Sequence, residues 1–94
     1  MKESKKMAMV YSTIDNRINN IMEYERVILE ALTVEYIGEK YRNFTSDDIW
    51  VLLEDYIDGH PDADNLCRSM DQILEFRKIR KELSALKAEI RALD

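Results

Sequence analysis

Apolar residues recur in steps of three and four along the last part of the chain, residues 75–94. This spacing is the heptad pattern of a coiled-coil helix, in which the a and d positions form one apolar seam. The segment holds only about two and a half heptads, a length at which isolated helices are marginally stable in water. It therefore predicts a helix that packs against another helix. The a and d positions are Phe76, Ile79, Leu83, Leu86, Ile90 and Leu93.

The charged positions that flank this seam favour a parallel homodimer. Glu75 and Glu82 occupy g positions, whereas Arg80 and Lys87 occupy e positions. In a parallel pair, a g residue faces the following e residue of the second copy, so Glu75 meets Arg80. Glu82 likewise meets Lys87, whereas an antiparallel pair sets glutamate against glutamate. We expect these charged residues and the seam to form a dimer interface. The alternative is that the helix is one element of a bundle core.

A second apolar stripe lies near the other end of the chain, interrupted only by Glu25. We expect one long helix or two successive helices over residues 5–41, with a kink at Asn16, Asn19 and Asn20, which have poor helix propensity. The first half of this region matches the C-terminal segment in length. The two can therefore pack on each other, within one chain or between chains, and two copies would form a four-helix arrangement. The stripe consists of Met7, Tyr11, Ile14, Ile18, Ile21, Ile28 and Leu32.

The clearest local signal is a helix start at Thr45. A threonine at this position is a favoured N-cap, and Asp47 and Asp48 place negative charge in the first helical turn. Gly59 and Pro61 end the apolar run that follows and open a turn. These residues predict a short helix that is bounded on both sides.

The whole chain, residues 1–94, is therefore expected to be a single all-α domain. No stretch alternates between apolar and polar residues as a strand would. The expected elements are an N-terminal helix or helix pair at 5–41, a second helix at 45–58 and a third at 63–93 that continues into the heptads.

Three segments follow one another in an order that is known from other proteins: an apolar helix at 28–41, the capped helix that begins at Phe44 and Thr45, and a polar helix from Asp64. This order resembles the helix-turn-helix core of winged-helix DNA-binding domains, especially small ones of phages and prokaryotes. The resemblance covers about residues 27–76. The heptad helix stands where such domains have their β-hairpin wing.

The resemblance implies a small dimeric transcriptional regulator whose third helix lies in the major groove of double-stranded DNA. Arginine can pair with guanine and glutamine with adenine, while serine can reach phosphate. The alternative is that the polar residues form only the solvent face of an amphipathic helix, since Asp64 and Asp71 beside them repel phosphate. The DNA-binding candidates are Asn65, Arg68, Ser69 and Gln72.

The charge of the chain favours a different partner. The net charge is −5, and the acidic excess lies in residues 25–63. Such a region repels phosphate and attracts cationic surfaces. The alternative function is therefore an acidic protein-interaction module, an inhibitor or adaptor of the phage type, which binds a basic protein and no DNA.

Little in the sequence can support catalysis. His60 is the only histidine and Cys67 the only cysteine, so a zinc site, a Ser/His/Asp triad and an internal disulfide lack their residues. No apolar run approaches the length of a membrane span. We expect a cytoplasmic protein that is not an enzyme, with no cofactor, no metal and no membrane contact.

Overall fold

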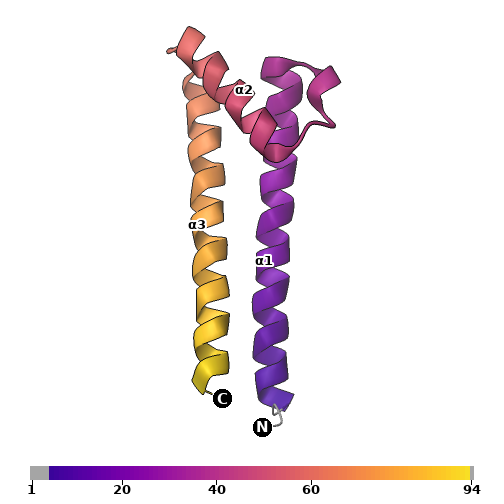
Figure 1. Ribbon diagram of the computed structural model, residues 1–94, viewed down its shortest axis with the longest axis vertical. Coiled ribbons are helices and arrows are strands. Elements are labelled where there is room, and N and C mark those ends of the chain that lie inside the picture. Colours follow the sequence, from indigo (N-terminus) through magenta and orange to yellow (C-terminus); the bar gives the residue numbers. More distant parts are fainter. Residues whose placement is uncertain (1–4, 94) are drawn as a thin grey trace.

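The computed structural model describes residues 5–93 and contains only helices and their connections over that range, which confirms the predicted all-α fold. Two long helices, α1 (Lys5–Leu32) and α3 (Asp64–Leu93), lie side by side and antiparallel (Figure 1). The shorter helix α2 (Ser46–Gly59) crosses them at the end where α1 stops and α3 starts. The molecule is elongated and measures 55 × 23 × 18 Å.

The two ends of the molecule differ in how they are packed. We call residues 29–73 the head, and the paired lengths of α1 and α3 at residues 5–28 and 74–93 the stem. All three helices contribute to a single core in the head, whereas the hydrophobic residues buried in the described stem are Tyr11 and Ile14. The head core consists of Leu29, Leu32, Ile49, Leu53, Leu66, Met70 and Ile73.

The start of α2 follows from its sequence. The Oγ1 atom of Thr45 accepts a hydrogen bond from the backbone N–H of Asp48 at 3.2 Å, which confirms the predicted N-cap. At the other end, the backbone N–H of His60 donates to the carbonyl oxygen of Ile57 at 3.0 Å, and the chain turns at Pro61 into α3. The cap and this turn fix the length of α2.

The end of α1 differs from the expectation. The helix continues through Asn16, Asn19 and Asn20 without a break, so the kink predicted there is wrong (Figure 1). The backbone changes instead to a π-helical turn, η1 (Thr33–Ile37), followed by a 3-10 turn, η2 (Glu39–Tyr41). Gly38 separates the two turns with a φ of 126°, a conformation that side chains disfavour. The three asparagines are exposed, so their weak helix propensity is overridden by the packing of the opposite side of α1.

Candidate functional site

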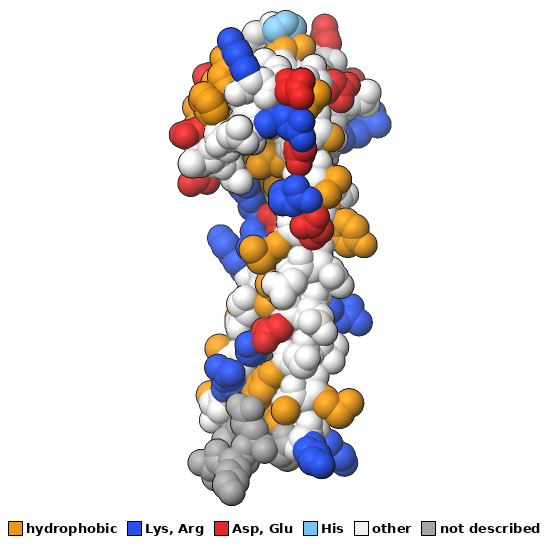
Figure 2. Space-filling model, turned by 90° about the vertical axis from the view of Figure 1, so that its right-hand side faces the viewer, with side chains coloured by type: hydrophobic (Ala, Val, Ile, Leu, Met, Phe, Trp, Pro, Cys, Tyr) orange, Lys and Arg blue, Asp and Glu red, His pale blue; other side chains and the backbone are white. Residues whose placement is uncertain are grey.

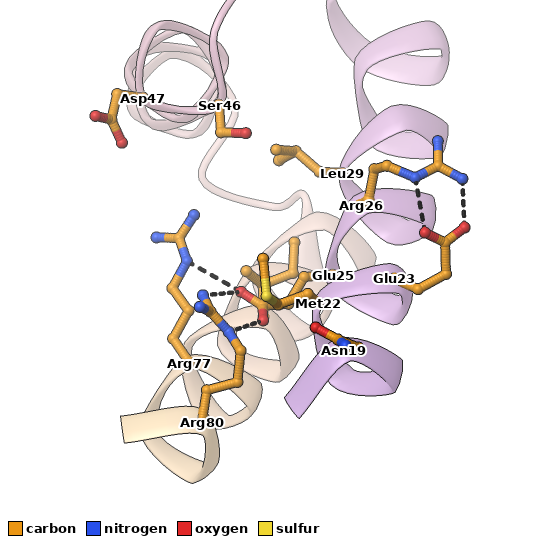
Figure 3. A pocket seen from close by; sticks show the side chains of 11 residues that line it. Asn19, Met22, Glu23, Glu25, Arg26, Leu29, Ser46, Asp47, Arg77 and Arg80 are labelled. Atoms are coloured by element: carbon orange, nitrogen blue, oxygen red, sulfur yellow. Dashed lines mark hydrogen bonds and ion pairs between the residues drawn. The ribbon is translucent and has the colours of Figure 1, made fainter. Parts of the chain in front are cut away.

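Glu25 is the one charged residue buried among residues 5–93, and it lies where the stem meets the head. Its carboxylate accepts two hydrogen bonds from Arg80 of α3, one of them from Nη2 to Oε1 at 2.9 Å. The Nε atom of Arg77, one turn earlier on α3, lies 3.4 Å from the same Oε1 atom (Figure 3). This cluster ties α1 to α3 through a carboxylate shared by two arginines.

A pocket of about 600 Å³ lies beside the cluster and reaches the start of α2 (Figure 3). Three arginines and three carboxylates line it, so it offers no net charge to an ionic ligand. Arg26 is bonded to Glu23, and the guanidinium of Arg77 stacks over the ring of Trp50 at 4.8 Å. Within the described residues, no group of three or more metal-ligating side chains occurs. The charged groups around the pocket therefore pair with one another and hold three helices together. This arrangement is typical of a structural site.

Polar and cation–π contacts also join the stem helices below Glu25. The Nζ atom of Lys87 lies 2.7 Å from the Oδ1 atom of Asp15, and the guanidinium of Arg91 lies 5.0 Å from the ring centre of Tyr11. The sequence assigned Arg80 and Lys87 to ion pairs between two copies of the chain. In the structure both cations are bound within one chain, to α1, while the homodimer itself stays a prediction.

The apolar seam of the heptads also packs largely within the chain. Phe76 stacks on Tyr24 of α1, with 6.1 Å between the ring centres. Leu86 and Leu93 remain 44% and 89% exposed. Of the other residues predicted at the dimer interface, Ile79, Leu83 and Ile90 are half-buried, and Glu75 and Glu82 are exposed.

A shallow groove lies between α1 and α3 at the end of the stem that is farther from the head. Its volume is about 480 Å³, and hydrophobic side chains dominate its lining. Among the described residues, the polar groups that line it are Lys6 and Thr13, both of α1. The hydrophobic lining residues are Met9, Val10, Ile14, Leu86 and Ile90.

The four DNA-binding candidates lie on the part of α3 that belongs to the head. Asn65, Arg68 and Gln72 are exposed, and Ser69 is half-buried. Asn65 and Gln72 stand seven residues apart and continue the d positions of the heptads, so they share the side of α3 that carries Leu86. The helical arrangement does not by itself indicate a helix-turn-helix domain.

A second groove lies on the head between α2 and α3. It has a volume of about 280 Å³, and Trp50, Ile57 and Leu74 contribute apolar surface to it. Glu54 of α2 and Asp71 of α3 stand on its two sides and are exposed. On the face drawn in Figure 2, acidic side chains gather over the head and are sparser along the stem.

Sequence reasoning missed two of these features. In the sequence, Glu25 interrupts an apolar stripe, and a lone carboxylate at a core position is itself a signal for a buried ion pair. Trp50, Glu54 and Ile57 recur at steps of four and three, which places a carboxylate between two apolar groups on one side of α2. That pattern predicts an acidic, apolar strip, although the position of α3 beside it cannot be obtained from α2 alone.

The chain matches no protein-family model, no curated protein and no solved structure. Within residues 5–93, every helix is too short or too polar to cross a membrane.

Proposed function

We propose that this chain is a protein-interaction module that acts by binding, and that its head groove takes an amphipathic, basic helical segment of a partner protein. The observation that carries the proposal is the groove between α2 and α3, which combines an apolar floor with carboxylates on both sides. An amphipathic helix that inserts its apolar side into such a groove is a recurring mode of peptide recognition.

Charge supports a basic partner over an acidic one. The exposed acidic residues around the groove belong to both of the helices that form it, and Arg68 is the exposed cation of α3 within the head. Charge complementarity of this kind steers encounter and excludes partners of the wrong sign. The exposed acidic residues of α2 and of the head part of α3 are Asp47, Asp48, Glu54, Asp55, Asp58, Asp64 and Asp71.

The proposal can be tested with synthetic helical peptides. One peptide carries leucine on one side and lysine on the other, and its counterpart carries glutamate in place of lysine. Trp50 lines the groove and is the only tryptophan of the chain, so its fluorescence reports binding directly. We expect the basic peptide to change the Trp50 emission at low ionic strength and the acidic peptide to leave it unchanged.

Matched variants locate the binding site. Glu54→Lys combined with Asp71→Lys should weaken binding of the basic peptide by about tenfold or more, since both charges flank the groove. Asp55→Lys is the control, because Asp55 is exposed on α2 but does not line the groove. No binding of the basic peptide, or equal losses in both variants, would contradict the proposal.

The second candidate function is DNA binding by a dimeric regulator. What supports it is the exposure of Asn65, Arg68 and Gln72 on one helix, with spacings that suit a helix in the major groove. The exposed carboxylates of Asp64 and Asp71 on the same helix weigh against it. A gel shift with random and genomic duplexes at low salt should show binding that Arg68→Ala reduces. A complete lack of binding removes this candidate.

A further inference from the structure

The two sides of the stem carry different chemistry. Arg80 and Lys87 lie on one side of α3, where they bind Glu25 and Asp15 of α1. The pocket beside Arg80 is also lined by the start of α2, so this is the side that the head overhangs. The opposite side of the stem is formed by other residues of α1 and α3.

We call this opposite side of the stem the open face. Ile79 and Leu86 each precede Arg80 and Lys87 by one residue, which turns their side chains about 100° around α3, away from the ion pairs. On α1 the open face carries Val10 and Tyr24, which are 38% and 60% exposed. The apolar groove that contains Val10 and Leu86 lies at the end of this face that is farther from the head.

The open face carries apolar side chains like those of a protein interior, but no other described helix covers it. In a four-helix bundle, each helix buries apolar side chains against two neighbours, whereas each stem helix here has one neighbour. The half-exposed hydrophobic side chains form a row along the stem and give a second pair of helices a place to pack. This feature concerns the stem and does not depend on the function proposed for the head.

We propose that a second copy of this chain packs its open face against this one, forming a four-helix bundle with its two-fold axis parallel to the helices. In that arrangement α1 of each copy lies against α3 of the other, and all neighbouring helices are antiparallel. The rival arrangement has its axis perpendicular to the helices, so that α1 packs on α1 and α3 on α3.

The charges at the edges of the open face select between these two arrangements. On α1, the exposed charges that lie beside the open face are the cations Lys6 and Arg17. On α3 they are anionic, at Glu75, Glu82 and Glu89. A parallel axis sets the cations against the anions, whereas a perpendicular axis sets like charges against each other, which disfavours that pairing.

The register within the chain identifies the contact. Asp15 pairs with Lys87, so Arg17 stands level with about residue 85 of α3. Glu82 and Glu89 of a second copy therefore lie just above and just below Arg17, within reach of its long side chain. Arg17 thus takes the place between copies that the heptad pattern alone gave to Arg80 and Lys87.

Two oppositely charged variants test the contact. Variant A carries Arg17→Glu, and variant B carries Glu82→Arg with Glu89→Arg. Each variant on its own should dimerise about tenfold or more weakly than the wild type, because like charges then face each other. An equimolar mixture of A and B should recover the dimer, since every contact is complementary again. Sedimentation velocity reports the mass in each case.

A matched control tests whether the loss of dimer is specific to charges beside the open face. Lys81→Glu reverses an exposed charge of α3 on the side away from the open face and should leave the dimer unchanged. All variants alter exposed residues, so circular dichroism should show wild-type helix content. A wild type that stays monomeric, or a variant A that dimerises like the wild type, would overturn the proposal.

A distance measurement tests the direction of the axis. Spin labels at Asp64→Cys in a Cys67→Ser background sit about 28 Å above Leu83, the middle of the open face, by the helical rise of 1.5 Å per residue. A parallel axis brings both heads to one end and the labels to about 20 Å, whereas a perpendicular axis separates them by about 55 Å. We expect the short distance, and the long one would overturn the arrangement.

Discussion

The head and the stem use the same helices in opposite ways. In the head, α1 and α3 meet α2 around a core in which Leu53, Leu66 and Ile73 have no exposed surface. In the stem the same two helices meet only each other, and their polar contacts, from Glu25 down to Tyr11, lie along one side. A third helix therefore completes the packing of the head, and the stem has no equivalent.

The comparison of head and stem shows that ion pairs align two helices but do not replace a packed apolar core. They fix the register of α1 against α3, because each cation has a defined acceptor or ring on the other helix. They do not remove apolar surface from water, which is the main source of folding free energy. The stem is thus well aligned but incompletely buried, and this is why its open face is a site for association.

The largest effect is expected in the head core. Leu53→Ala should lower the free energy of unfolding by about 2–5 kcal/mol, the usual cost of a cavity at a fully buried leucine. Urea unfolding at several protein concentrations measures it. Leu86→Ala in the stem should cost less than about 1 kcal/mol where the chain is monomeric, and more as the concentration rises and the dimer forms. Equal costs for both variants at low concentration would contradict the distinction between head and stem.

The next largest loss of stability is expected where the stem meets the head. Glu25→Ala leaves Arg77 and Arg80 without the carboxylate they share, and should cost about 1–3 kcal/mol in unfolding free energy. Asp15→Ala is the matched control, because its pair with Lys87 is more exposed and should contribute less than about 1 kcal/mol. A larger loss in the control than in Glu25→Ala would show that burial does not decide the strength of these pairs.

The smallest effect is expected for an exposed pair on α1. The hydrogen bond from Arg26 holds the pKa of Glu23 below its ordinary value of 4.5. A lowered pKa in the folded state stabilises the protein above the ordinary pKa, and this contribution is lost as the pH falls through the lowered value. Glu23→Gln should therefore flatten the acid limb of the stability curve slightly. An identical acid limb in both proteins would contradict this role of the pair.

Local features such as the helix cap and the turn could be predicted from the sequence more reliably than the partner against which each helix packs. The N-cap at Thr45 and the turn at Gly59 and Pro61 depend on neighbouring residues, so they were visible in the sequence alone. The partners of the heptad seam were not, because an apolar position at a heptad spacing packs equally well on α1 or on a second copy. Arg80 illustrates the reason: its acceptor, Glu25, is 55 residues away in the sequence.

The candidate surfaces were predictable to a smaller extent. The exposure of Asn65, Arg68 and Gln72 follows from helical periodicity. The head groove requires two helices in a fixed relation, and the open face requires knowledge of which sides α1 and α3 turn toward each other. Both surfaces could therefore be identified only from the three-dimensional structure.

The mass of the protein in solution shows whether a second copy completes the stem. Sedimentation equilibrium at micromolar concentration should give about twice the chain mass of 11.1 kDa for the wild type and a single chain mass for Leu86→Asp. Because Leu86 is exposed within one chain, the variant should keep its helix content. A monomeric wild type, or a Leu86→Asp variant that remains dimeric, would show that no second copy packs on the open face.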